Sequence, residues 1–355
     1  MRLALSVLDL APVAAGRRAA DALAGTVALA RRAEALGFAR FWVAEHHDSP
    51  SVASTAPETL VAHVAARTRR IRVGAGGVML PNHAPLAVAE RFGMLEALHP
   101  GRIDLGLGRD SGASARVGAL LRRADPDRFA EHVAELRGHL GSGHAGIRAV
   151  AGKHAVPQLW MLGSSDAGAR TAAELGLPFV FAAHFHPHLT EPALALYRER
   201  FVASDVAARP QVIVCAGVVM GHSDEEAARL ALPGGVGTLW RRQGRPAALP
   251  SPAVADAIVR RLRGAERAVV RDAIGRLFVG SPATVVAGLS RLVERSGADE
   301  LMVTSPLADA AARAAGLEHI AAAFGSPSGQ PAPDGAGRRD DAAAQSGAPL
   351  RSQHG

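Results

Sequence analysis

The chain has 355 residues, of which 48% are hydrophobic and 4% aromatic, and its formal net charge is +7. This length and apolar content suffice for a large core, and an α/β barrel of this size forms one domain. The positive charge is almost entirely arginine dispersed among acidic residues, without a basic stripe or stacking motif, which argues against a nucleic-acid partner. No apolar run approaches the length of a membrane span, and the start of the chain does not resemble a signal peptide. The single cysteine, Cys215, excludes an internal disulfide, so we expect a cytoplasmic protein with no membrane partner.

Short apolar runs alternate along the chain with longer stretches of helical spacing. The apolar runs predict eight strands, at residues 3–8, 38–43, 71–74, 102–107, 158–162, 179–183, 212–219 and 300–304. Helical spacing covers residues 21–36, 57–68, 85–98, 125–140, 166–175 and 308–324. Strands that alternate with helices indicate a parallel sheet, and eight such units suit a TIM (β/α)8 barrel better than an open sheet.

Two segments depart from this even spacing. The connection between the seventh and eighth strands, residues 220–299, is enlarged. It contains a Pro/Gly/Arg-rich loop over residues 232–252, and helices are expected around 253–277 and 282–295. Because a barrel carries its chemistry on the loops after the strands, this connection is expected to cover that end as a lid. After residue 324 the chain is rich in Gly, Pro, Ala and Ser, which predicts a disordered tail (325–355) after one barrel domain (1–324).

Histidines concentrate where the predicted strands end. Of the fifteen histidines, seven follow a strand: His46, His47, His83, His184, His186, His188 and His222. In a closed barrel these positions share one rim, and imidazoles titrate near neutral pH, so a functional rim is favoured over chance placement in polar loops. Three of the histidines alternate along the chain, but no cysteine or group of carboxylates completes a ligand set, and no metal site is predicted.

Glycines and hydroxyl groups mark three further strand ends. The glycines of residues 106–112 do not match a dinucleotide-binding loop, because the third comes one residue too late for G-x-G-x-x-G. Ser164, Ser165 and Asp166 precede a predicted helix, so one of them is expected to cap it, and the free N–H groups there would favour a phosphate. The glycines that follow Ala75 would let a flat ring approach the backbone, although an ordinary tight turn also explains them.

Five separated blocks of the sequence resemble the bacterial luciferase-like flavin monooxygenases. In chain order, the blocks are residues 36–47, 73–81, 100–109, 162–166, and 279–282 with 297–301. The resemblance extends over about residues 1–324 and implies a TIM barrel, usually a homodimer, that binds reduced FMN at the C-terminal rim. It also implies that dioxygen and the reduced FMN oxygenate a small organic substrate, and that a separate NAD(P)H:flavin reductase supplies the flavin.

The resemblance assigns cofactor contacts to residues of this chain. Arg109 matches the arginine that meets the FMN phosphate, as a charge-assisted donor. Ser164 and Ser165 match positions that contact the phosphate and ribityl groups. Relatives carry a non-proline cis peptide near the position of Ala75 and Gly76, which implies a backbone contact with the flavin there.

Four histidines are the candidates for chemistry and substrate binding. His46 matches the histidine implicated in catalysis, where it would act as a base or hydrogen-bond partner beside the flavin. His47, His83 and His184 are expected to line the substrate pocket, and His47 is also expected to orient its loop.

Two other functions are compatible with the same barrel. A related group of barrels transfers hydride with a deazaflavin and without oxygen, and it holds the phosphate of its cofactor in a similar way. A non-catalytic flavin-binding subunit would also share the fold. The presence of His46 argues against the second alternative, because a subunit without chemistry does not need that residue.

Overall fold

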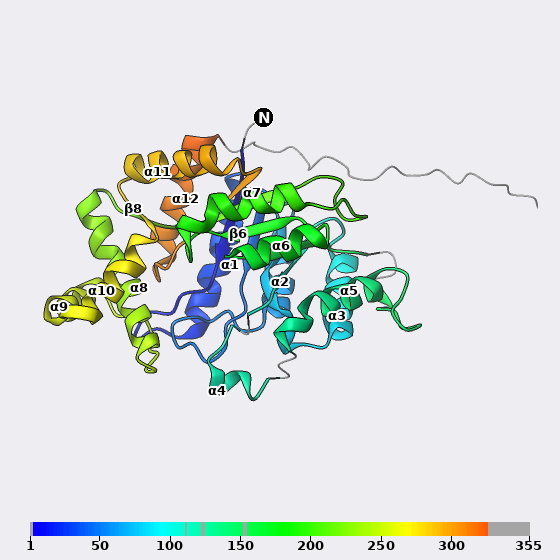
Figure 1. Cartoon of the computed structure of the whole chain (residues 1–355). Helices are drawn as coiled ribbons and strands as arrows, with labels where there is room; N and C mark the ends of the chain where they lie inside the picture. Colours follow the sequence, from blue (N-terminus) through cyan, green and yellow to red (C-terminus); the bar gives the residue numbers. More distant parts are fainter. Residues whose placement is uncertain (1–2, 111, 122–124, 152–154, 326–355) are drawn as a thin grey trace, which may run out of the picture.

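The computed structural model describes residues 3–110, 112–121, 125–151 and 155–325 (Figure 1). Eight parallel strands form a closed barrel: β1 Ala4–Asp9, β2 Arg40–Val43, β3 Arg72–Met79, β4 Ile103–Gly108, β5 Gln158–Gly163, β6 Phe179–Ala182, β7 Val212–Met220 and β9 Glu300–Thr304. The barrel closes because β6 pairs with β7, and β9 pairs with both β7 and β1. All eight predicted strands and the TIM-barrel fold are therefore confirmed.

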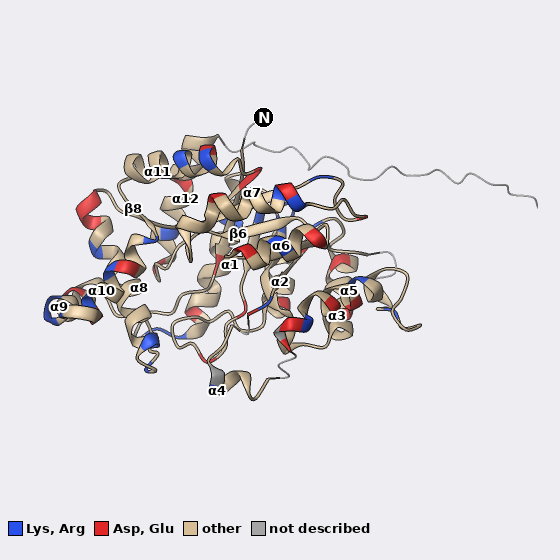
Figure 2. Ribbon diagram, viewed as in Figure 1, with Lys and Arg blue, Asp and Glu red and all other residues tan. Residues whose placement is uncertain are grey.

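Helices surround the barrel. Their bounds are α1 Ala19–Ala35, α2 Pro57–Ala65, α3 Pro85–Leu98, α4 Ala115–Gly118, α5 Phe129–Leu140, α6 Asp166–Glu174, α7 Thr190–Arg200, α8 Asp224–Arg242, α9 Pro252–Arg261, α10 Gly264–Gly275, α11 Pro282–Ser296 and α12 Ala310–Phe324. The sequence patterns did not indicate α7, nor the three-residue strand β8, Phe278–Gly280, which pairs with β7. Acidic and basic residues are interspersed along the outer helices, as the dispersed arginines led us to expect (Figure 2). None of the described helices combines the length and the apolar content that crossing a bilayer requires.

Large side chains fill the barrel interior. Trp42 and Trp160 meet edge to face, with ring centroids 5.9 Å apart, and Met302 belongs to the same buried cluster. Glycines on β3 make room for this cluster. A Cβ atom at Gly74 would lie 2.8 Å from the indole nitrogen of Trp42, and one at Gly76 would lie 2.7 Å from its ring carbon Cε3. The β3 glycines therefore have a packing role inside the barrel.

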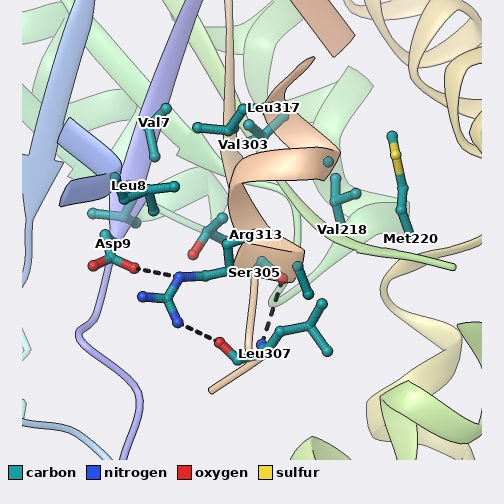
Figure 3. Close-up of a pocket in the computed structure, with 14 residues that line it drawn as sticks. Val7, Leu8, Asp9, Val218, Met220, Val303, Ser305, Leu307, Arg313 and Leu317 are labelled. Carbon is teal, nitrogen blue, oxygen red and sulfur yellow. Dashed lines mark hydrogen bonds and ion pairs between the residues drawn. The ribbon is translucent and has the colours of Figure 1, made fainter. Parts of the chain in front are cut away.

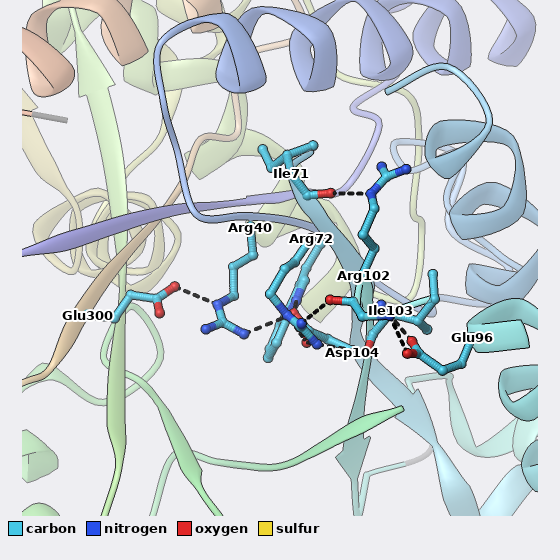
Figure 4. Close-up of polar contacts among 10 residues, drawn as sticks. Arg40, Ile71, Arg72, Glu96, Arg102, Ile103, Asp104 and Glu300 are labelled. Carbon is cyan, nitrogen blue, oxygen red and sulfur yellow. Dashed lines mark hydrogen bonds and ion pairs between the residues drawn. The ribbon is translucent and has the colours of Figure 1, made fainter. Parts of the chain in front are cut away.

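A layer of buried charges closes the opposite end of the barrel from the loops that follow the strands (Figure 4). The Arg40 guanidinium donates to Asp104 at 2.9 Å and to Glu300 at 2.8 Å. Arg72 and the Trp42 indole also donate to Asp104, at 2.6 and 2.8 Å. Burial alone would lower the pKa of Arg40, but the two carboxylates outweigh it and raise that pKa above its ordinary value. In this layer the positive charges of the arginines and the negative charges of the carboxylates therefore compensate each other.

The loop predicted in the connection between β7 and β9 is partly wrong. Residues 232–242, predicted as loop, form the second half of α8, which passes through the buried Pro233. Close helix packing explains this continuation, because a Cβ atom at Gly235 would lie 2.8 Å from Val270 of α10. Figure 1 shows α8, α9 and α10 together at one side of the barrel. The tail predicted over residues 325–355 lies, beyond Gly325, outside the described residues.

Candidate functional site

The loops that follow the strands form the C-terminal end of the barrel, here called the mouth. The loop after β2 carries His46 and His47 and is held by backbone hydrogen bonds on both sides. The His46 amide donates to the Ser54 carbonyl at 3.1 Å, and the His47 amide donates to the Gly112 carbonyl at 3.0 Å. The Ser54 hydroxyl also donates to the Ala44 carbonyl at 2.5 Å. The histidine loop therefore has a fixed position against the loop after β4.

A buried carboxylate lies in the centre of the mouth loops. Glu45 is 0% exposed and accepts hydrogen bonds from the Nε2 atoms of His47 and His83, at 2.8 and 3.0 Å. The Asn82 amide donates to it at 3.0 Å, and the Met79 backbone N–H donates at 2.8 Å. Burial by itself raises the pKa of Glu45, but these hydrogen bonds outweigh it and hold the pKa below its ordinary value. Two of the predicted pocket histidines are thus partners of an ionised carboxylate, which the sequence reasoning missed.

His46 and His184 lie close enough to influence each other. Burial lowers the pKa of His46, and the positive charge of Arg241 on α8 lowers it further. Within the described part of the chain, the buried Nδ1 atom of His46 has no hydrogen-bond partner. Burial also lowers the pKa of His184 to about 4, and its Nδ1 atom lies 3.2 Å from the Cys215 carbonyl, to which it donates. Both imidazoles are therefore neutral at pH 7.

The start of α6 offers groups suited to an anion. Ser165 occupies the N-cap position, but its hydroxyl makes no capping hydrogen bond, contrary to the expected cap. The Ser164 carbonyl accepts a hydrogen bond from His186 Nδ1 at 3.2 Å. On the neighbouring strand β4, Arg109 follows the last strand residue, is exposed, and forms no ion pair with any residue that the structure describes. Arg109, Ser164 and Ser165 thus share one stretch of the mouth.

The predicted cis peptide lies one residue later than expected. It joins Gly76 and Gly77, whereas the sequence placed it near Ala75 and Gly76. The Ala75 side chain is buried in the core between barrel and helices, and the Cβ direction of Gly76 faces Trp42 inside the barrel. Neither residue therefore offers a side chain to the mouth.

Of two cavities, one lies away from these groups and the other adjoins the start of α6 through His186. One, of about 30 Å³, lies between the barrel wall and α12, where Arg313 contacts Asp9 at 3.4 Å and donates to the Leu307 carbonyl (Figure 3). It has room for a water or two and not for a substrate. The other, of about 260 Å³, is a surface hollow between the loop after β6 and α10, lined in part by His186 and Arg276. Among the described residues, no three or more His, Cys, Asp or Glu side chains are arranged so that they could hold a metal ion.

Comparisons with known proteins identify the family of this chain. The family model described as "Luciferase-like monooxygenase" matches residues 3–300. A protein of Escherichia coli (strain K12) with that same name is 39% identical over 316 residues, covering 88% of this chain and 94% of its own. The crystal structure of apo-MsnO8 is 36% identical, covers 91% of this chain and 98% of its own, and has a TM-score of 0.83.

A more distant solved structure shares the fold. The oxygenating constituent of 3,6-diketocamphane monooxygenase from Pseudomonas putida, solved in complex with FMN, is 21% identical and has a TM-score of 0.66. It covers 90% of this chain and 97% of its own. The match of the family model over most of the barrel, together with a nearly full-length relative, establishes the family. The chain belongs to the luciferase-like monooxygenases.

Proposed function

We propose that this protein is a monooxygenase that uses reduced FMN and dioxygen to oxygenate a small organic substrate. The observation that carries the proposal is the neutral imidazole of His46, whose Nδ1 atom lacks a partner within the described residues. It lies in the same mouth as the arginine and the helix start that suit a phosphate. A proton-transfer group and an anion site on neighbouring loops are what flavin chemistry requires.

The phosphate end of the cofactor fits Arg109, Ser164 and Ser165. Arg109 supplies a positive charge that no described carboxylate neutralises, and the Ser165 hydroxyl is not occupied by capping. The first backbone N–H groups of α6 add the partial positive charge of a helix N-terminus. Ala75 and Gly76 would contact the flavin through their backbone. A solved relative in fold holds FMN, which supports this choice of cofactor.

When bound, the reduced flavin supplies the electrons that activate dioxygen for transfer of one oxygen atom to the substrate. His46 accepts or donates a proton at Nδ1, and its lowered pKa keeps the ring neutral and available as a base. His184 donates to the Cys215 carbonyl, which fixes its ring and leaves Nε2 as an acceptor. The rings of His47 and His83 are held on Glu45 at the same mouth.

The connection between β7 and β9 contributes to exclusion of water. Leu249 exchanges hydrogen bonds with the loop after β1, as donor to the Val13 carbonyl at 2.9 Å and as acceptor from the Ala15 amide at 2.7 Å. This contact brings the segment after α8 to the edge of the mouth. We propose that it covers the bound substrate, because a closed site strengthens the electrostatic interactions inside it.

Anaerobic titration with reduced FMN, followed by mixing with air-saturated buffer, tests the proposed function. We expect saturable binding and substrate-dependent incorporation of oxygen-18 from labelled dioxygen, measured by mass spectrometry over a panel of thioethers, ketones and aldehydes. Arg109→Ala is expected to weaken FMN binding by about 10- to 100-fold, because a charge-assisted hydrogen bond to phosphate is lost.

The matched control is Arg67→Ala, since Arg67 follows α2 at the other end of the barrel. It should leave FMN binding unchanged. Absence of FMN binding together with binding of a deazaflavin would contradict the proposal in favour of hydride transfer. Binding of FMN without label in any product would favour a non-catalytic flavin carrier.

The charge of Arg241 gives a pH prediction. His46 has a lowered pKa, partly because Arg241 disfavours its protonation. Arg241→Gln removes that repulsion, so the pKa of His46 should rise toward its ordinary value. If neutral His46 is the base, the acid limb of kcat/KM moves to higher pH in this variant. Arg242→Gln is the control, because the Arg242 side chain lies 3.8 Å from Asp272. An acid limb that stays at the same pH in both variants would show that Arg241 does not set the protonation of the base.

A further inference from the structure

We propose that Glu45 is the positioning residue of the mouth. In this role one buried carboxylate fixes the tautomers of two histidines and joins the loop after β2 to the loop after β3. The inference rests on the proposed function only for its effect on turnover. Its structural part concerns the histidine rings and can be measured without cofactor or substrate.

Both carboxylate oxygens of Glu45 are used. Oε1 accepts from His47 Nε2 at 2.8 Å and from Asn82 Nδ2 at 3.0 Å. Oε2 accepts from the Met79 backbone N–H at 2.8 Å, and His83 Nε2 lies 3.0 Å from each oxygen. Since Glu45 is 0% exposed, these protein groups replace the water that an ionised carboxylate would otherwise need.

The carboxylate determines which nitrogen of each ring carries the proton. An ionised carboxylate can only accept hydrogen bonds, so the Nε2 atoms of His47 and His83 must both be protonated. In the neutral rings the basic nitrogen is then Nδ1, on the other side of each ring from Glu45. A carboxylate that orients a histidine in this way acts through the histidine and does not itself contact the substrate.

The same contacts fix the position of His46. Glu45 precedes His46 directly, and its hydrogen bonds to Met79, Asn82 and His83 attach that part of the chain to the end of β3. On the other side, the His46 and His47 amides donate to Ser54 and Gly112. His46 therefore lies between two anchored neighbours, while its own Nδ1 atom has no partner in the described residues.

A structural role alone does not account for this arrangement. A buried carboxylate carries a desolvation cost that a well-packed apolar side chain would avoid, so a stable loop could be built without it. Glu96 provides the comparison within this chain. It is also a buried carboxylate, but among the described residues its donors are backbone N–H groups, those of Gly101 at 2.5 Å and Ile103 at 3.0 Å, at the end of the barrel away from the mouth. Glu45 differs because three side chains of the mouth depend on it.

The test compares Glu45→Gln with Glu96→Gln in the full chain. Nitrogen-15 spectra of the histidine side chains report the tautomer, and they are recorded without cofactor. In the unaltered protein His47 and His83 should both carry the proton on Nε2. Glutamine has one carbonyl oxygen and a donating NH2 group, so in Glu45→Gln at least one of the two rings should lose its acceptor and become a mixture of tautomers. Glu96→Gln should leave both rings unchanged.

Turnover provides the second readout. Glu45→Gln is expected to lower kcat by about 10- to 100-fold, as loss of a carboxylate that orients a histidine does elsewhere, while the dissociation constant of reduced FMN stays within about threefold. Glu96→Gln should retain kcat. Unchanged tautomers in Glu45→Gln, or a kcat equal to that of Glu96→Gln, would overturn the inference. If the unaltered protein did not oxygenate any substrate, the proposed function would fail, but the tautomer measurement would still test the role of Glu45.

Glu45→Asp keeps the test decisive if Glu45→Gln does not fold. The charge is retained, so the buried donors keep an ionised acceptor, but the shorter side chain cannot reach both rings. One ring should lose its fixed tautomer, and kcat should fall between the values of the unaltered protein and of Glu45→Gln. Two fixed tautomers with an unaltered kcat in this variant would contradict the positioning role.

Discussion

Replacement of Arg40 by methionine is expected to lower the free energy of unfolding by about 3–5 kcal/mol. Arg40 lies between Asp104 and Glu300, at 2.9 and 2.8 Å, inside the barrel. Methionine fills a similar volume but leaves the two carboxylates without their shared cation. Asp104 is 0% exposed and retains Arg72, while Glu300 retains the Ser6 hydroxyl. The cost arises mainly from the carboxylate charge that stays buried without compensation.

Urea denaturation followed by circular dichroism measures this loss. Arg91→Met is the control, because Arg91 pairs with Glu58 at 2.9 Å on the outer helices and its side chain is half exposed. Surface ion pairs of this kind contribute little, so its transition should barely move. A second variant that combines Arg40→Met with Glu300→Gln should recover part of the stability. Equal midpoints for Arg40→Met and Arg91→Met would show that the buried layer tolerates an unpaired charge.

His46→Ala is expected to lower oxygenating turnover by about 10²- to 10⁴-fold, the usual contribution of a general acid or base. The reason is the loss of the only group identified at the mouth that is neutral, titratable and lacks a partner among the described residues. Reduced FMN should bind with nearly unchanged affinity, since the residues proposed to bind its phosphate, Arg109, Ser164 and Ser165, lie on other loops. The measurement is the incorporation of labelled oxygen with saturating reduced FMN, over a range of pH.

The pH profile separates a proton-transfer role from a packing role. Without the His46 imidazole, the acid limb of the pH profile should disappear. His319→Ala, at an exposed position of α12, is the control and should keep the profile of the unaltered protein. A His46→Ala variant with full turnover and the same acid limb would show that another group moves the proton.

The barrel could be predicted from the sequence because its signals are local. Apolar runs such as residues 212–219 lie between turn residues, and each became a strand, although β3 extends five residues beyond the end predicted at residue 74. The second half of α8 could not be predicted in this way. Pro233 and its following glycines are helix breakers in isolation, but packing of Gly235 against Val270 stabilises the helix there. Tertiary contact outweighed local propensity.

For a similar reason, only part of the candidate site could be predicted from the sequence. The rim histidines and the start of α6 were found because strand ends are visible in the sequence. Glu45 was missed, although it directly precedes His46, because its burial depends on Asn82 and His83, which lie 37 and 38 positions further along the chain. Arg241 was missed because its segment was read as an irregular loop. An acidic residue between a buried strand and two histidines is the signal that would have indicated Glu45.

The charged layer of Arg40, Asp104 and Glu300 also affects the route by which small molecules can reach the mouth. Together with Trp42 and Trp160 above it, the layer gives the barrel a solid floor, so the interior is no passage from one end to the other. A cofactor or substrate that binds at the mouth, as proposed, would therefore enter and leave on the side of the loops that follow the strands.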